Sequence, residues 1–226
     1  MILPNTKKRW YLLPSLFLLC WSCRFSATPE PDSQQIDAQS FQVKRLQQYD
    51  SVIYPTLIHQ VQTGDMVLRS GSDMTSEMLR QMNQTDKRYS HCGIASIEND
   101  TVFVYHAIGG EFNPDQRIKR EPLYSFCHAA DNKAAAIFRP QFPASKNRVI
   151  ATQANHFWLQ GIPFDMAFDY HTEDRFYCAE FVAKTIARAV ADSSWFTFST
   201  AGKMQYVGVD NLLLSPVMKT VVEKNY

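Results

Sequence analysis

The sequence carries almost no net charge, shows no internal repeats and lacks an uninterrupted apolar run of membrane-spanning length. Its formal net charge is +1, whereas binding to a nucleic-acid backbone requires a basic surface that releases counterions. We therefore expect no nucleic acid among its partners. Hydrophobic residues make up 45% of the chain and charged residues 20%, which is typical of a globular protein and not of a disordered one.

Clustered histidines are also missing. Four of the six histidines have no partner at the spacing of a metal-binding motif: His59, His128, His156 and His171. The sequence therefore predicts neither a metal ion nor another cofactor.

The first 27 residues have the pattern of a signal peptide. Lys7, Lys8 and Arg9 precede an apolar run of about a dozen residues, whereas a membrane-spanning helix needs about 20. Two processing sites compete. Cleavage before Cys23 leads to acylation of its sulfur, as in a bacterial lipoprotein, and the alternative is a conventional cut near Ala27. We expect export in either case, as a periplasmic protein or as an outer-membrane lipoprotein anchored through its N-terminal lipid.

The rest of the chain divides into a tether and one domain. Residues 28–40 are rich in Pro, Ser, Gln and Asp and have little to bury, so we expect a tether there. Residues 41–226 have the length of a single domain.

Both processing sites leave three cysteines in the mature chain: Cys92, Cys127 and Cys178. Three cysteines cannot all pair, and an odd cysteine in an oxidising compartment indicates a reactive thiol. The alternatives are a disulfide between Cys92 and Cys127, or three inert buried thiols.

Periodicity and turn residues predict the secondary structure of the domain. We expect a helix over residues 41–58 with a turn near Pro55, a strand after Gly64-Asp65, a helix over residues 74–84, a hairpin of residues 91–97 and 101–108, a strand over residues 134–139, and helices over residues 147–159 and 178–190. Ser72 or Asp73 is placed to cap the second of these helices. Its apolar stripe is predicted to be core: Met74, Met78, Leu79 and Met82.

The polar residues 109–133 are expected to be irregular, with a solvated basic cluster of Arg117, Lys119 and Arg120. One or two short elements are expected over residues 207–214 and 216–222.

Cys178 stands at the start of the last predicted helix, whose apolar residues fall on one face. A cysteine attacks as its thiolate, so its pKa must be lowered by a histidine, by a helix N-terminus, or by both. The backbone N–H groups of the first turn also stabilise an oxyanion. Cys178 is therefore the candidate nucleophile, although a buried structural cysteine at a helix start is common.

The predicted hairpin brings two histidines together. If Asn99 and Asp100 form the turn, Gly93 lies opposite His106, and His91 becomes a diagonal neighbour of His106 on the same face. Gly93 leaves room between the two rings. A base histidine needs a third polar group that fixes its tautomer, and His106 stands at that position. The alternative is two unrelated histidines, because a one-residue slip in register separates them.

These motifs in this order resemble those of the permuted papain-like amidases of the YiiX/YaeF type, relatives of the NlpC cell-wall peptidases. The residues that carry the resemblance are Gly64-Asp65, Tyr89-Ser90-His91-Cys92-Gly93-Ile94, Val104-Tyr105-His106-Ala107 and Tyr177-Cys178-Ala179-Glu180. In permuted enzymes the histidine strand precedes the cysteine helix, as it does here.

The resemblance implies a papain-like α+β fold with an antiparallel sheet and the nucleophile at a helix N-terminus. It implies Cys178 as nucleophile and His91 as base, and His106 matches the third position as in lecithin:retinol acyltransferase-like relatives. Cys92 replaces the commoner aliphatic residue, and strand alternation points it away from the His91 face, so we expect it in the core. Glu180 and Asp65 are expected to be structural.

The sequence thus predicts a cysteine hydrolase that cleaves an amide bond, with cell-wall or exogenous peptide as substrate. Two alternatives remain open: a lipid acyl hydrolase or acyltransferase that uses the same residues, and a catalytically silent binding module.

Overall fold

The computed structural model describes residues 33–110 and 116–226, with side chains described from Asp37 onward. The predicted signal peptide and the beginning of the predicted tether lie outside the described residues. Within the described part, no helix combines the length and the apolar character needed to cross a bilayer.

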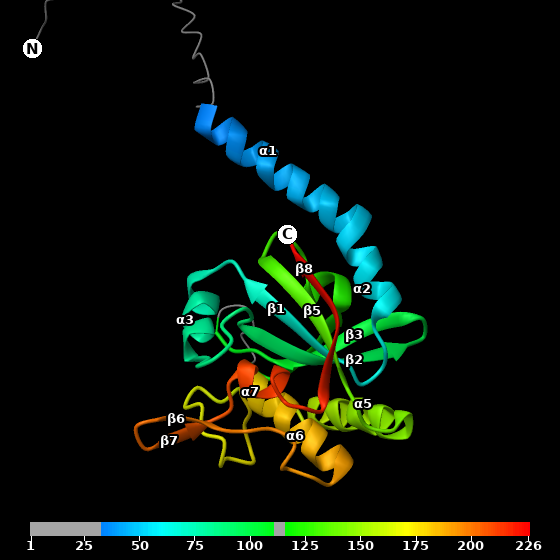
Figure 1. Ribbon diagram of the computed structural model, residues 1–226, viewed down its shortest axis with the longest axis vertical. Coiled ribbons are helices and arrows are strands. Elements are labelled where there is room, and N and C mark those ends of the chain that lie inside the picture. Colours follow the sequence, from blue (N-terminus) through cyan, green and yellow to red (C-terminus); the bar gives the residue numbers. More distant parts are fainter. Residues whose placement is uncertain (1–32, 111–115) are drawn as a thin grey trace, which may run out of the picture.

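A six-stranded antiparallel sheet is the centre of the domain, with strand order β4-β3-β2-β1-β5-β8 (Figure 1). The strands are β1 (Met66–Gly71), β2 (His91–Glu98), β3 (Thr101–Ala107), β4 (Ile118–Pro122), β5 (Asn132–Pro140) and β8 (Met218–Asn225). A separate hairpin consists of β6 (Ser199–Ala201) and β7 (Met204–Tyr206). Neighbours along the chain mostly pair in the sheet, as is usual for antiparallel strands.

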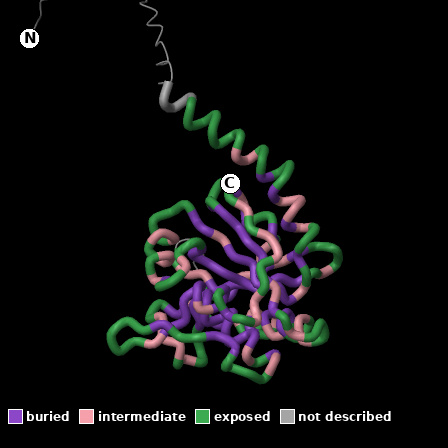
Figure 2. The backbone as a smooth tube through the Cα atoms, in the orientation of Figure 1, coloured by how far each residue is buried: buried purple, intermediate pink, exposed green. Residues whose placement is uncertain are grey.

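Side-chain alternation along the strands gives the sheet two buried faces. On one face Met66 and Leu68 belong to a core that includes residues of α5 (Ala144–Leu159), α6 (Cys178–Val190) and α7 (Val209–Leu213). On the other face Val67 belongs to a core with residues of the N-terminal helical segment and of α4 (Leu123–Phe126). Figure 2 shows the buried residues concentrated along the strands and on the sides of the helices that face them.

The N-terminal helical segment is longer than the sequence predicts. It comprises α1 (Ser33–Gln48), a π-helical stretch η1 (Tyr49–Ile53) and α2 (Tyr54–Gln60). Its first residues fall within the predicted tether, and α1 projects from the domain with most of its described residues exposed (Figures 1 and 2). The turn expected near Pro55 is wrong, because Pro55 lies in α2, which continues from η1 without a break in the helical backbone conformation.

Most other predicted elements are confirmed. The hairpin, the strand over residues 134–139 and the helices over residues 147–159 and 178–190 all correspond to observed elements, namely β2–β3, β5, α5 and α6. Short elements are also present where they were expected, as α7 and β8. Asp73 caps α3 (Met74–Met82), because its side chain accepts a hydrogen bond from the Ser76 backbone N–H.

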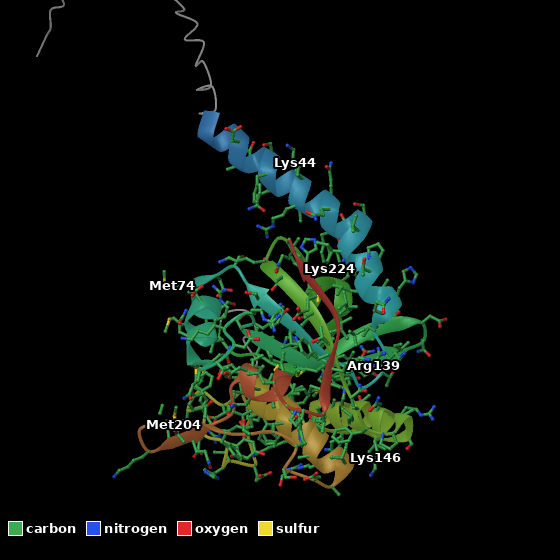
Figure 3. All side chains as sticks on the ribbon, in the orientation of Figure 1. Lys44, Met74, Arg139, Lys146, Met204 and Lys224 are labelled. Carbon is green, nitrogen blue, oxygen red and sulfur yellow. The ribbon has the colours of Figure 1, made fainter. Side chains whose placement is uncertain are left out.

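The prediction that the Met stripe of α3 is core is wrong. Met74 is 81% exposed and Met78 is 67% exposed, while Leu79 and Met82 are only partly covered. Figure 3 shows Met74 at the outer edge of the molecule. The periodicity correctly indicated a helix, but an apolar face is buried only when another element packs on it, and α3 contacts the sheet mainly through β1, the strand that precedes it.

The prediction that residues 109–133 are irregular is also wrong. Beyond residues 111–115, which lie outside the described part, this segment contains β4 and α4. The basic cluster falls on β4 or next to it, and Arg120 forms an ion pair with Glu98 of β2. Pairing with β3 provides the order that the local sequence does not encode.

Candidate active site

The β2–β3 hairpin has the register that the sequence predicts. Glu98 lies opposite Thr101, and Asn99 and Asp100 form the turn with φ values of 46° and 63°. This left-handed pair is typical of a tight hairpin turn, which both residue types tolerate. The register brings His91 Nε2 to 2.7 Å from His106 Nδ1, with the two rings almost perpendicular. The predicted histidine pair is therefore present.

Gly93 lies between the two histidines, as predicted from the sequence. A Cβ atom at this position would lie 2.6 Å from the Tyr105 carbonyl oxygen and 3.0 Å from His106 Cβ. Any side chain here would push β3 away from β2. The absence of a side chain at Gly93 is what allows the two rings to approach.

Cys178 is the first residue of α6, at the positive end of its dipole. Glu180 Oε2 accepts a hydrogen bond from the Tyr177 backbone N–H at 3.2 Å, which fixes the start of the helix. The Cys178 thiol interacts with the side chains of Cys92 and His91 and with the Ala179 backbone N–H, and each of these interactions lowers its pKa. The candidate nucleophile and the candidate base, which are 87 positions apart in the sequence, are thus in contact.

The surroundings poise these groups for proton transfer. Burial lowers the pKa of His91 to about 4, although the adjacent Cys178 raises it, so the imidazole is neutral and able to accept a proton. The pKa of the Cys178 thiol lies well below its ordinary value, because hydrogen bonding from Cys92 and the proximity of His91 stabilise the thiolate more than burial opposes it. A neutral imidazole beside an acidic thiol is the arrangement expected for nucleophilic catalysis.

Cys92 has a second property that was not predicted from the sequence. It is fully buried in the core beneath α6, as predicted. Its thiol, however, also contacts Cys178, and both burial and this contact raise the pKa of Cys92 well above the usual value. Strand alternation indicates which face Cys92 occupies, but not that the N-terminus of α6 packs on that face. All three described cysteines are free thiols, so the alternative disulfide between Cys92 and Cys127 is not formed.

A cavity of about 440 Å³ opens beside Cys178 and His91. One part of its wall is apolar and includes Leu79, Phe164 and Phe168. The rest carries charged groups from β1 and β4, from the residue that precedes α3 and from the turn that precedes β5. These charged residues are Arg69, Asp73, Lys119, Glu121 and Asp131. The wall beside the reactive sulfur therefore combines an apolar surface with charged groups.

A carboxylate from β4 completes the group around the histidines. Glu121 Oε1 lies 2.9 Å from His106 Nε2, and Phe126 of α4 lies against both imidazole rings. Glu121 was not predicted from the sequence, because residues 109–133 were expected to be irregular. Residues 118–122 read Ile-Lys-Arg-Glu-Pro, which has no alternation of apolar and polar residues that would have indicated a strand.

Asp65 and Glu180 have the structural roles that the sequence predicts. Asp65 accepts hydrogen bonds from the Gln62 backbone N–H and from the Arg139 guanidinium, both at 2.8 Å or less. Glu180 caps α6 and forms a 3.0 Å ion pair with Lys184. Neither residue lines the cavity.

Comparison with known proteins agrees with the fold and with the order of the motifs. Residues 60–213 match the model of the permuted papain-like amidase enzymes, YaeF/YiiX, C92 family. A similar solved structure is that of metalloprotein yiiX from Escherichia coli O157:H7, with a TM-score of 0.59 and 20% identity over 74% of this chain and 99% of that chain. No curated protein matches the sequence significantly.

The name of that structural neighbour, a metalloprotein, raises the question of a metal site in this chain. The described residues contain no cluster of three or more His, Cys, Asp or Glu side chains that is arranged to hold a metal ion.

The family match covers more than half of the chain and includes the histidine hairpin, the cavity and the cysteine helix. The order of these elements, with the histidine strand before the cysteine helix, is that of a permuted papain-like enzyme. The chain therefore belongs to the YaeF/YiiX family of permuted papain-like amidases, the C92 family, and is a cysteine hydrolase of the amidase type.

Proposed function

We propose that the protein is an exported cysteine amidase in which Cys178 is the nucleophile, His91 the general base and His106 the group that orients His91. The observation that carries the proposal is the contact of Cys178, at the N-terminus of α6, with an imidazole whose Nε2 is held 2.7 Å from His106. The proposed substrate is a peptide amide, with cell-wall peptide or an exogenous peptide as the source.

The proposed reaction is acyl transfer through a thioester. His91 removes the thiol proton, and the Cys178 sulfur attacks the carbonyl carbon while the carbonyl oxygen becomes an oxyanion. Backbone N–H groups of the first turn of α6 stabilise this charge. The C–N bond then breaks and the amine leaves with the proton from His91. Water, deprotonated by His91, attacks the thioester, and the C–S bond breaks to release the acid and restore Cys178.

The first test is the rate of iodoacetamide alkylation at Cys178 as a function of pH, followed by mass spectrometry. The wild-type protein should label rapidly below about pH 7, well under the pKa of a free thiol. The variant His91→Ala should lose this reactivity, whereas His59→Ala, a replacement of an exposed histidine on α2, should keep it. Slow labelling that is unaffected by His91→Ala would contradict the enzyme assignment and favour a silent binding module.

A lipid acyl hydrolase or acyltransferase is the second candidate, and the apolar wall of the cavity favours it. Leu79, Phe164 and Phe168 line the space beside Cys178, and Met166 adds an exposed apolar side chain to its lining. Incubation with phospholipid vesicles should then leave a fatty acyl group on Cys178, detected by mass spectrometry and absent in Cys178→Ala. Cleavage of peptide amides without acyl retention favours the amidase.

Export and lipid anchoring are further parts of the proposal, and the leader in the sequence supports them. A polypeptide cleaved before Cys23 should carry a diacylated N-terminus and fractionate with membranes. The variant Cys23→Ser should release such a protein into the soluble exported fraction. A mature N-terminus near residue 28 with no lipid in the wild type would instead indicate a periplasmic protein.

A further inference from the structure

Three side chains from three adjacent strands form a continuous line behind the proposed nucleophile. His91 of β2 contacts His106 of β3 through a 2.7 Å Nε2 to Nδ1 distance, and His106 Nε2 lies 2.9 Å from Glu121 Oε1 of β4. His106 is completely buried, and the side chain of Glu121 is 18% exposed. Among the described residues His106 Nε2 has no well-aligned hydrogen bond, and Glu121 Oε1 is the acceptor that approaches it.

The chemistry of imidazole links the protonation of these groups. A neutral imidazole has one N–H and one lone pair, so two neighbouring rings that share a hydrogen bond must have matched tautomers. An ionised carboxylate only accepts hydrogen bonds. Beside Glu121, His106 therefore carries its proton on Nε2, and its Nδ1 is an acceptor. His91 must then carry its proton on Nε2, which leaves Nδ1 as the free lone pair for the Cys178 proton.

The charges around Glu121 keep it ionised at neutral pH. Burial alone raises its pKa, but the contact with His106 and the positive charges of Lys119 and Arg69 bring the pKa of Glu121 down to about 2. Lys119 Nζ lies 3.7 Å from Glu121 Oε2. Burial keeps His106 neutral by lowering its pKa to about 4, despite Glu121. A further titratable group near Glu121 is the buried thiol of Cys127, whose pKa is raised to about 12, so it stays uncharged.

We propose that Glu121 is a positioning residue of this site, because it sets the tautomer of His106 and, through it, selects Nδ1 of His91 as the base. This inference rests on the proposed function, since it assigns a role within the same Cys178–His91–His106 group. Glu121 contacts His106 and is not among the groups that contact the Cys178 sulfur. The arrangement is therefore a line of four side chains, here called the relay, that begins at Cys178, passes through His91 and His106, and ends at the Glu121 carboxylate on β4.

The decisive substitution is Glu121→Gln, which keeps the shape of the side chain. A glutamine can either donate or accept at the position that faces His106, so the tautomer is no longer imposed. Glu121→Asp restores a carboxylate, and Glu98→Gln is the matched control. Glu98 is also a carboxylate on this sheet and is paired with a β4 cation, Arg120, but it lies at the turn end of β2, away from the histidines.

Two measurements on the full-length protein test whether Glu121 sets the tautomer of His91. The first is the alkylation rate of Cys178 against pH. The second is a long-range ¹H–¹⁵N correlation spectrum of the histidine rings, which distinguishes protonated from unprotonated ring nitrogens. In Glu121→Gln the alkylation rate near neutral pH should fall about ten- to a hundredfold, less than the ~10⁴-fold seen when a carboxylate directly on the base is lost, because His106 stands between. The ring nitrogens of His91 should also change from one tautomer to a mixture.

Each outcome decides between the proposals. The relay is supported if the alkylation rate recovers in part in Glu121→Asp and stays at the wild-type value in Glu98→Gln. The thermal midpoint of Glu121→Gln should be unchanged. A Glu121→Gln protein that keeps the wild-type rate and His91 tautomer overturns the role of Glu121 and leaves the proposed function intact. A wild-type Cys178 with no enhanced reactivity overturns the proposed function itself.

Discussion

Replacing Gly93 with alanine tests the geometry on which the proposed site depends. The added Cβ would lie 2.6 Å from the Tyr105 carbonyl oxygen, 2.6 Å from Val104 Cγ1 and 3.0 Å from His106 Cβ. Two of these distances are far inside normal van der Waals contact, so β3 must move away from β2. Overpacking of this kind costs about 1–3 kcal/mol of unfolding free energy.

The same movement should separate His106 from His91, whose ring nitrogens are 2.7 Å apart. A shift of about 1 Å takes that distance beyond the hydrogen-bonding range and releases the orientation of His91. We therefore expect Gly93→Ala to lower the alkylation rate of Cys178 at neutral pH by about tenfold or more, since correctly placed acid–base groups contribute about 10²–10⁴-fold. Urea unfolding measures the stability, and iodoacetamide labelling measures the site.

Gly202→Ala is the control for stability loss without damage to the site. A Cβ at Gly202 meets no atom within 4 Å, but its φ of 61° disfavours alanine by about 1 kcal/mol. This variant should lose stability and label normally. If Gly93→Ala instead keeps both wild-type stability and the wild-type pH–rate profile, the argument that an open position at residue 93 holds the histidine pair together is refuted.

Three other predictions concern single features of the protein. Cys92→Ala removes a hydrogen bond that stabilises the Cys178 thiolate, so the thiol pKa should rise and labelling at pH 6 should slow while labelling above pH 9 stays unchanged. Burial lowers the pKa values of His91 and His106 to about 4, so their contribution to stability is present above about pH 6.5 and is lost as the pH falls toward 4. The unfolding free energy, measured against pH, should therefore fall more steeply in the wild type than in the variant with both histidines replaced by glutamine. Equal slopes in the two proteins would contradict this contribution of the histidines to stability. Met78→Lys on the exposed face of α3 should change the unfolding free energy by no more than about 0.5 kcal/mol, and a loss above about 2 kcal/mol in a thermal melt would show that this face is packed.

Patterns confined to short stretches predicted much of the site. The Asn99-Asp100 turn fixes the register of the hairpin, and a period of two then places His91 and His106 on one face. The start of an amphipathic helix places Cys178 at an N-terminus. Turn conformation, strand alternation and helix amphipathicity depend on residues only a few positions apart, so they can be read directly from the sequence.

The tertiary structure decided which of these elements meet. The N-terminus of α6 packs where Cys92 lies, and β4 pairs with β3 so that Glu121 reaches His106. The apolar face of α3 remains exposed because no element covers Met74. Each of these outcomes depends on the order of strands in the sheet and on helix docking. Such contacts join residues from 15 to 86 positions apart, and no local pattern encodes them.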